Sequence, residues 1–221
     1  MEHIVTGFVS FRNKVFPRHR KLFAELANGQ SPEVLFITCA DSRIDPNLVT
    51  QTRPGDLFIV RNAGNIVPPH GGMVGGVTAS IEYAVAVLNV GHIVICGHTH
   101  CGAMTGALDP GALEDLPHVR KWLELSLAAV EVVRHAHGSI GPEQLRAVTE
   151  QNVLVQLQHL RTHPVVASRL AAGQLQLHGW MYEIESGDVY AYAEERNAFV
   201  PMAERYAAML KPEGAAHGAD V

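Results

Sequence analysis

Residues 34–43 read VLFITCADSR, an apolar run that leads into Cys39 and then an aspartate and an arginine. Residues 93–102 read IVICGHTHCG, a second apolar run that leads into His98 and Cys101. Short apolar runs of this kind predict buried strands. In an open parallel sheet, ligands bind beyond the carboxyl ends of the strands, so we expect the two clusters to meet at one edge of a sheet.

Cys39, His98 and Cys101 together form a set of metal ligands. Two thiolates and an imidazole suit zinc, and three protein ligands leave one coordination position open, as in catalytic rather than structural zinc sites. The alternative for His98 and Cys101 alone is a buried histidine beside a free core thiol. The addition of Cys39 favours zinc, one ion per chain.

The rest of the chain alternates strand and helix patterns, which predicts an α/β fold with a mainly parallel central sheet flanked by helices. We expect strands at residues 34–38, 57–61, 92–96 and 174–184, the last with a hairpin partner at 189–193. Helical spacing of apolar residues predicts two helices before the first strand, one ended by Pro17 and one at residues 22–27. Further helices are expected on the apolar stripes Val77 to Leu88; Val119, Leu123, Leu127 and Val130; and Val153, Leu157 and Leu160.

No linker or repeat divides the chain, so we predict one domain over residues 1–210 with a helical arm at 1–29. The tail at 211–221 is rich in glycine and alanine and has little to bury, which predicts disorder.

Composition limits the class of function. The chain has 221 residues, 47% of them apolar, and a formal net charge of −5 without blocks of lysine or arginine, which argues against nucleic acid or an anionic membrane as partner. Three cysteines make no disulfide framework, the N-terminus lacks the form of a signal peptide, and no apolar run reaches the roughly 20 residues of a membrane span. We therefore expect a cytoplasmic protein.

Seven short motifs occur in order along the chain: Gln30–Pro32, Cys39–Arg43, Pro54–Asp56, Arg61–Asn65, Ile81–Ala84, Gly97–Gly102 and His178–Trp180. With these motifs the chain, from about Gly7 to Pro201, closely resembles the β-class carbonic anhydrases, in particular the plant-type and related bacterial branch.

The resemblance implies the reversible hydration of carbon dioxide to bicarbonate, with a zinc-bound hydroxide as nucleophile. Cys39, His98 and Cys101 would hold the zinc, since the family pattern matches His98 rather than His100, which we place at the rim. Arg43 would hold Asp41, whose carboxylate orients the nucleophile. In a closed state at lower pH, Asp41 would become a fourth zinc ligand.

The resemblance also implies a substrate pocket and an assembly. The pocket residues would be Gln30, Phe58, Ala63, Tyr83 and Gly102, with Tyr83 supplied by a neighbouring subunit. The N-terminal helices would pack on a partner in a homodimer or a higher even-numbered homo-oligomer. Phe36 stands where members with an inhibitory bicarbonate pocket carry tryptophan, and Gln30 matches the plant type, so we expect an open zinc site.

Three alternatives to this function follow from the same residues. A cysteine phosphatase loop needs five residues between its cysteine and arginine, whereas Cys39 and Arg43 are separated by three. Hydrolysis of carbon disulfide or carbonyl sulfide would use the same zinc ligands. A non-catalytic zinc or redox-sensing module would need a fourth permanent ligand or an exposed thiol of low pKa.

Overall fold

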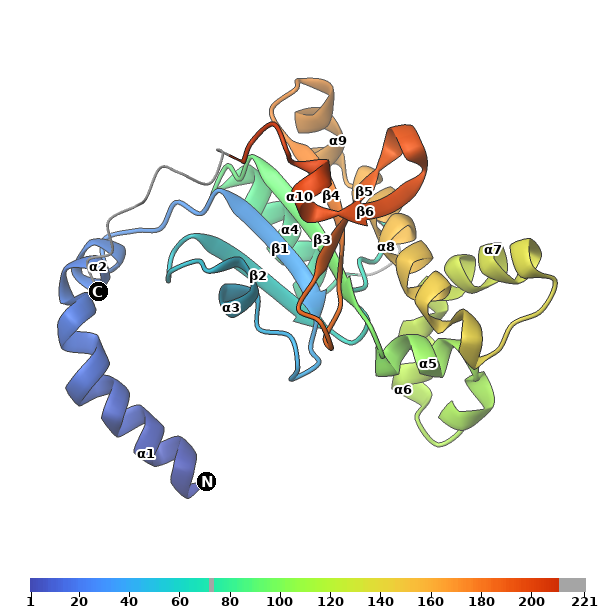
Figure 1. The fold of residues 1–221 in the computed structure, drawn as a ribbon. Coiled ribbons are helices and arrows are strands. Elements are labelled where there is room, and N and C mark those ends of the chain that lie inside the picture. Colours follow the sequence, from blue (N-terminus) through green and yellow to red (C-terminus); the bar gives the residue numbers. More distant parts are fainter. Residues whose placement is uncertain (72–73, 211–221) are drawn as a thin grey trace.

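The computed structural model describes residues 1–71 and 74–210, so the tail predicted at 211–221 lies outside the described residues. One six-stranded sheet has the order β2-β1-β3-β4-β5-β6 (Figure 1). Its strands are β1 Val34–Cys39, β2 Leu57–Asn62, β3 His92–His98, β4 Gln176–Tyr182, β5 Val189–Ala193 and β6 Ala198–Pro201. The first four pair in parallel, and β5 and β6 add an antiparallel edge. The predicted α/β fold with a mainly parallel sheet is confirmed.

Ten α-helices are present in the described part of the chain. They are α1 Glu2–Ser10, α2 Arg20–Leu26, α3 Pro46–Thr50, α4 Gly76–Ala86, α5 Gly102–Leu108, α6 Pro117–Leu123, α7 Leu127–His137, α8 Leu145–Arg161, α9 Pro164–Ala171 and α10 Met202–Arg205. Within the described ranges, no helix combines the length and the apolar character that crossing a bilayer requires.

The two faces of the sheet bury different residues because side chains alternate along a strand. Leu35 and Ile37 of β1 belong to the large core cluster that also holds residues of α4, α8 and α9. Phe36 and Val94 point to the other face, where they pack with Ile44 and the partly buried Trp180. Both faces of the sheet are therefore packed against other residues, and the carboxyl ends of its parallel strands remain as the place for a site.

A third core cluster lies beyond the carboxyl edge of the parallel strands. It contains Ile66, Met104 and Leu123 together with Cys39 and Cys101. Figure 1 shows α5, α6 and α7 gathered at this end of the molecule. The two cysteines are thus enclosed between the sheet and a helical lobe.

The N-terminal arm differs from its prediction. A π-helical turn at Phe11–Val15 and a 3₁₀ turn at Phe16–His19 connect α1 to α2, so Pro17 does not end the helical path. Proline is tolerated there because the first residues of a helical turn need no N–H partner. The rings of Phe16 and Phe23 stack at 5.3 Å, which holds the turn. In Figure 1 the arm extends away from the sheet.

The single helix predicted through Val119, Leu123, Leu127 and Val130 is wrong. A 3₁₀ turn at Glu124–Ser126 separates α6 from α7. As a result Leu123 and Val130 are buried, whereas Val119 and Leu127 are exposed.

The strand predictions erred at their ends. β3 continues past Cys96 because Gly97 and His98 pair with Met181 and Tyr182 of β4, a pairing that no local pattern reveals. The predicted strand 174–184 is shorter, and β6 was not predicted.

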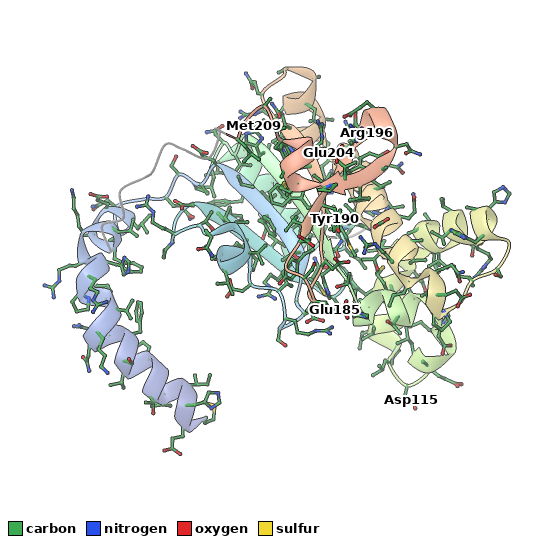
Figure 2. All side chains as sticks on the ribbon, in the orientation of Figure 1. Asp115, Glu185, Tyr190, Arg196, Glu204 and Met209 are labelled. Atoms are coloured by element: carbon green, nitrogen blue, oxygen red, sulfur yellow. The ribbon has the colours of Figure 1, made fainter. Side chains whose placement is uncertain are left out.

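The C-terminal α10 closes the antiparallel edge. Arg196, in the turn between β5 and β6, forms an ion pair with Glu204 of α10, and Figure 2 labels both side chains. Just after α10, the Tyr206 hydroxyl lies 3.0 Å from Nδ1 of His178 and accepts a hydrogen bond from the indole of Trp180. Both partners belong to β4, so these contacts fasten the end of the described chain to the sheet.

Candidate metal centre

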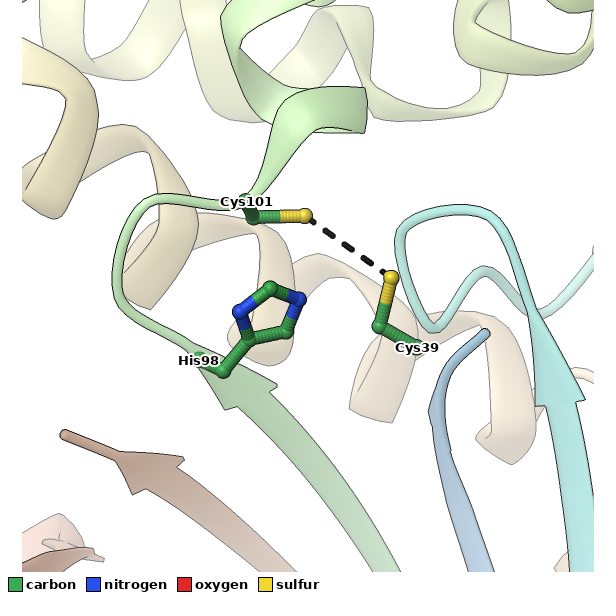
Figure 3. A group of neighbouring side chains, drawn as sticks. All are labelled: Cys39, His98 and Cys101. Atoms are coloured by element: carbon green, nitrogen blue, oxygen red, sulfur yellow. Dashed lines mark hydrogen bonds between the residues drawn. The ribbon is translucent and has the colours of Figure 1, made fainter. Parts of the chain in front are cut away.

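Three side chains converge at the carboxyl edge of the sheet, as Figure 3 shows. Cys39 is the last residue of β1 and His98 the last residue of β3, which are neighbouring strands. Cys101 immediately precedes α5 and points back toward them. The parallel pairing of β1 and β3 therefore brings together residues that are 59 positions apart in the chain, numbered 39 and 98.

The distances among the three donors suit a metal ion. The sulfur atoms of Cys39 and Cys101 are 4.0 Å apart, and the three ligand atoms all lie within 4.8 Å of one another. Tetrahedral zinc with sulfur ligands at about 2.3 Å needs donor separations of this order. In the described ranges 1–71 and 74–210, no other group of three or more histidine, cysteine, aspartate or glutamate residues brings its ligand atoms this close together.

His98 gives an independent test of the fit. The ring is fully buried, and its Nδ1 lies 2.8 Å from the carbonyl oxygen of Thr99, to which it can only donate. Its Nε2 is buried without a hydrogen-bond partner. A buried nitrogen left unpaired costs about 1–3 kcal/mol unless something binds it. With the proton on Nδ1, the Nε2 lone pair is free for a metal, and the donor set fits zinc.

The electrostatics of the centre favour a thiolate at Cys39 and a neutral thiol at Cys101. The hydrogen bond shared with Cys101 lowers the pKa of Cys39 to about 4, aided by His98 and the Gly64 amide against the cost of burial. The same contact, together with burial, raises the pKa of Cys101, because a second negative sulfur beside the first is unfavourable. Burial lowers the pKa of His98, but its contacts with Cys39 and Thr99 outweigh burial and the net direction is upward. A divalent cation would remove the conflict between the two sulfurs.

Asp41 lies beside the donors and is held by Arg43. Nε of Arg43 donates to one carboxylate oxygen of Asp41 at 2.9 Å, and an Nη donates to the other at 2.7 Å. The same Nη also donates to the carbonyl of His100 at 3.0 Å. The second carboxylate oxygen is 3.8 Å from Nε2 of His98, and the hydrogen bonds from Arg43 hold the pKa of Asp41 well below its usual range. Asp41 is therefore an ionised carboxylate next to Nε2 of His98, one of the three atoms that would hold a metal.

The structure separates the predicted pocket residues into two groups. Ala63 and Gly102 flank the donors, since Gly64 contacts the sulfur of Cys39 and Gly102 follows Cys101. Phe58 instead pairs with Leu35 near the start of β1, about 13 Å from Cys39 at the usual rise per strand residue.

Tyr83 and Gln30 belong with the distant group. The ring of Tyr83 lies 6.0 Å from that of Phe58, and Gln30 precedes β1 at its amino end. His100 is exposed, and its ring contacts Glu185 at 3.2 Å, so it lies at the rim.

Two backbone groups that support the donors were not predicted. The amide of Gly64 donates to the sulfur of Cys39 at 3.4 Å, and the carbonyl of Thr99 orients the His98 ring. Almost every residue has the same backbone amide and carbonyl, so the residue types in a sequence do not show which of these groups will support a site. The only signal for the first was the glycine itself, which has a positive φ of 81°.

Comparisons with known proteins all lead to one family. The carbonic anhydrase family profile matches residues 34–189. A carbonic anhydrase from Pseudomonas aeruginosa is 49% identical over 205 residues, covering 92% of this chain and 93% of its own length. The solved structure of the β-carbonic anhydrase CcaA superposes with a TM-score of 0.88 at 45% identity, covering 91% of this chain and 98% of its own. A β-carbonic anhydrase from Sordaria macrospora, described as tetrameric, gives a TM-score of 0.74 at 31% identity over 86% of this chain and 95% of its own.

Proposed function

The chain belongs to the β-class carbonic anhydrases, and from this premise we propose how its residues divide the reversible hydration of carbon dioxide to bicarbonate. The observation that carries the proposal is the buried convergence of Cys39, His98 and Cys101 beside an ionised carboxylate. We assign one zinc ion per chain to these three residues, bound through Sγ of each cysteine and Nε2 of the histidine. Zinc supplies a Lewis acid that makes hydroxide available near neutral pH.

Asp41 orients the attacking oxygen in this proposal. Its carboxylate is ionised, so it can only accept hydrogen bonds, and its Oδ2 lies 3.8 Å from Nε2 of His98, a proposed ligand atom. Arg43 fixes both oxygens and is itself fixed by the carbonyl of His100. The fixed carboxylate would accept a hydrogen bond from the attacking hydroxide and so orient it toward carbon dioxide. If Arg43 released the carboxylate, Asp41 could turn toward the metal as a fourth ligand, which is the proposed closed state.

The substrate pocket is completed by a second copy of the chain. Ala63 and Gly102 are contributed by the same subunit as the metal ligands, since both flank the donors. Gln30, Phe58 and Tyr83 lie toward the other end of β1, so in this proposal the partner subunit supplies them. Carbon dioxide has little polarity, and the rings of Phe58 and Tyr83 give an apolar wall suited to it.

We propose a homodimer or a higher even-numbered homo-oligomer in which the N-terminal arm covers the partner. The support is that α1 buries none of its residues, although Ile4 and Phe8 are 59% and 67% exposed. A cytoplasmic location is proposed as well, and the support is that all three cysteines are free thiols.

Stopped-flow hydration of carbon dioxide, at about pH 6.5 and about pH 8.5 on protein of measured zinc content, tests the proposal. Fast turnover at both values with one zinc per chain supports the open site. Activity at the higher value alone indicates that Asp41 closes onto the metal. Absence of turnover with zinc bound would contradict the assigned roles and redirect the test to carbon disulfide and carbonyl sulfide.

A further inference from the structure

One peptide group of the loop after β2 faces a metal ligand. The amide of Gly64 donates to Sγ of Cys39 at 3.4 Å. Gly64 has a φ of +81°, and a Cβ there would lie 3.0 Å from the end of Met104 and 3.1 Å from the Cβ of Ala103. Glycine is therefore required for this peptide to approach the sulfur.

The carbonyl of the same peptide is held from the helical lobe. Nε1 of Trp122, in α6, donates to the carbonyl oxygen of Ala63 at 2.8 Å. A trans peptide is planar, with its C=O and N–H pointing in opposite directions, so a donor that fixes the oxygen of Ala63 also aims the N–H of Gly64. A hydrogen bond accepted at the oxygen also polarises the peptide and strengthens the bond donated by its N–H.

The next carbonyl in the loop is held by a different helix. Nδ2 of Asn152, in α8, donates to the oxygen of Gly64 at 3.0 Å. One turn further along α8, Nε2 of Gln156 donates a hydrogen bond to Oδ1 of Asn152 at 2.8 Å. Oε1 of Gln156 accepts a hydrogen bond from the backbone amide of Val67, also at 2.8 Å. Asn152 and Gln156 are both fully buried. Two successive carbonyls are thus fixed by side chains from two helices.

We propose that Trp122 is a positioning residue of the metal centre, acting through the Ala63–Gly64 peptide on the thiolate of Cys39, with Asn152 as the second anchor of that loop. The inference rests on the proposed zinc centre. A hydrogen bond from an N–H partly neutralises the charge of a thiolate and fixes the orientation of its sulfur. Groups that hydrogen-bond to metal ligands in this way affect how tightly the metal is bound. Trp122 itself touches neither substrate nor metal in this scheme.

The two tryptophans of the chain allow a matched experiment. Trp122→Phe removes the indole N–H and keeps an aromatic ring. Trp180→Phe removes the indole hydrogen bond to Tyr206, in a cluster that contains none of the three ligands. The full-length protein and both variants are stripped of metal and titrated with zinc against a chelator of known affinity. Each is also loaded with cobalt, and the thiolate-to-cobalt charge-transfer band is recorded.

Trp122→Phe should bind zinc about tenfold more weakly and shift the cobalt band, whereas Trp180→Phe should match the unaltered protein in both. Equal zinc affinity and an unshifted band in Trp122→Phe would overturn the inference. An unaltered protein that binds no zinc would instead contradict the proposed zinc centre, so the two failures are distinguishable.

A measurement on the unaltered chain tests the inference even if the Trp122→Phe variant does not fold. With cadmium-113 in the site, the amide proton of Gly64 should show scalar coupling to the metal through the sulfur of Cys39. Absence of that coupling would also overturn the inference, because Trp122 would then have no N–H···S bond to direct.

Discussion

Cys39 and His98 direct their donor atoms into one buried centre. Sγ of Cys39 lies 4.0 Å from that of Cys101, and Nε2 of His98 is buried without a partner. Cys39→Ser or His98→Ala should therefore lose both zinc and turnover, because two remaining ligands hold the ion poorly. Zinc analysis after dialysis, together with a hydration assay, measures both.

Cys96 gives the matched control for that prediction. It is fully buried in β3, and burial raises the pKa of its thiol to about 12, so it remains a neutral core residue. Cys96→Ala should lose some stability and keep its zinc. Turnover by a zinc-free Cys39→Ser protein would contradict the mechanism.

Asp41 and Arg43 act on the reaction rather than on metal retention. Neither belongs to the group of three metal donors, and Arg43 holds Asp41 through two nitrogens. Asp41→Ala should keep zinc and lose roughly 10²-fold or more in kcat, the usual contribution of a positioned proton acceptor. Arg43→Lys should also lose turnover, because an ammonium group cannot bind both carboxylate oxygens and the His100 carbonyl in the same planar arrangement. Kinetics on variants of equal zinc content measure this, and a zinc-depleted Asp41→Ala protein would show that the carboxylate is a ligand instead.

Among the elements, β4 and the segment after α10 depend on a histidine that stays neutral. Burial, with help from His92 and Arg205, lowers the pKa of His178 to about 4. Its Nδ1 contacts the hydroxyl of Tyr206 at 3.0 Å, and its Nε2 contacts Nδ1 of His92 at 3.1 Å. An unfolded histidine titrates near pH 6.5, so between about pH 6.5 and pH 4 the unfolded chain binds the extra proton.

The free energy of unfolding should therefore fall as the pH drops from about 6.5 to about 4. Above about pH 6.5 His178 is neutral in both the folded and the unfolded chain, so its titration no longer changes the stability. His178→Gln cannot bind the proton, so its stability should depend less on pH between about 6.5 and 4 than that of the unaltered protein. Denaturant unfolding at a series of pH values measures both slopes. Parallel slopes for the two proteins would show that folding does not lower the pKa of His178.

The elements also show what the sequence could predict. The apolar runs at β1 and β3 predicted both strands and, through the parallel pairing of their carboxyl ends, the meeting of Cys39 with His98. The break between α6 and α7 was missed because Val119 and Leu127 continue an apolar stripe although both are exposed. The bond from Trp122 to Ala63 was missed for a different reason, because it depends on how the helical lobe packs on the loop, which no local spacing encodes.

At the scale of the whole molecule, the N-terminal arm supports the proposal that the working unit contains more than one chain. The apolar residues Ile4, Phe8, Phe11 and Val15 recur at helical spacing along the arm and are all exposed. At about 25 cal/mol per Å², covering such a stripe favours association. The distant position of Phe58 and Tyr83 favours the same conclusion, because the substrate wall proposed for them would need a metal centre from another chain.

Phe8→Asp should therefore reduce both the assembly and the activity, since a carboxylate buried against a partner without a cation is costly. Light scattering after size-exclusion chromatography measures the mass, and stopped-flow hydration at the same concentrations measures turnover. Thr6→Asp is the matched control: it adds the same charge to the same helix, but at 100° per residue Thr6 lies about 160° around the helix from Phe8, away from the apolar stripe. Zinc content should stay constant in both variants, because all three ligands come from one chain. A Phe8→Asp protein that is smaller but fully active would show that each subunit builds its pocket alone, and one of unchanged mass would show that the arm does not hold the assembly together.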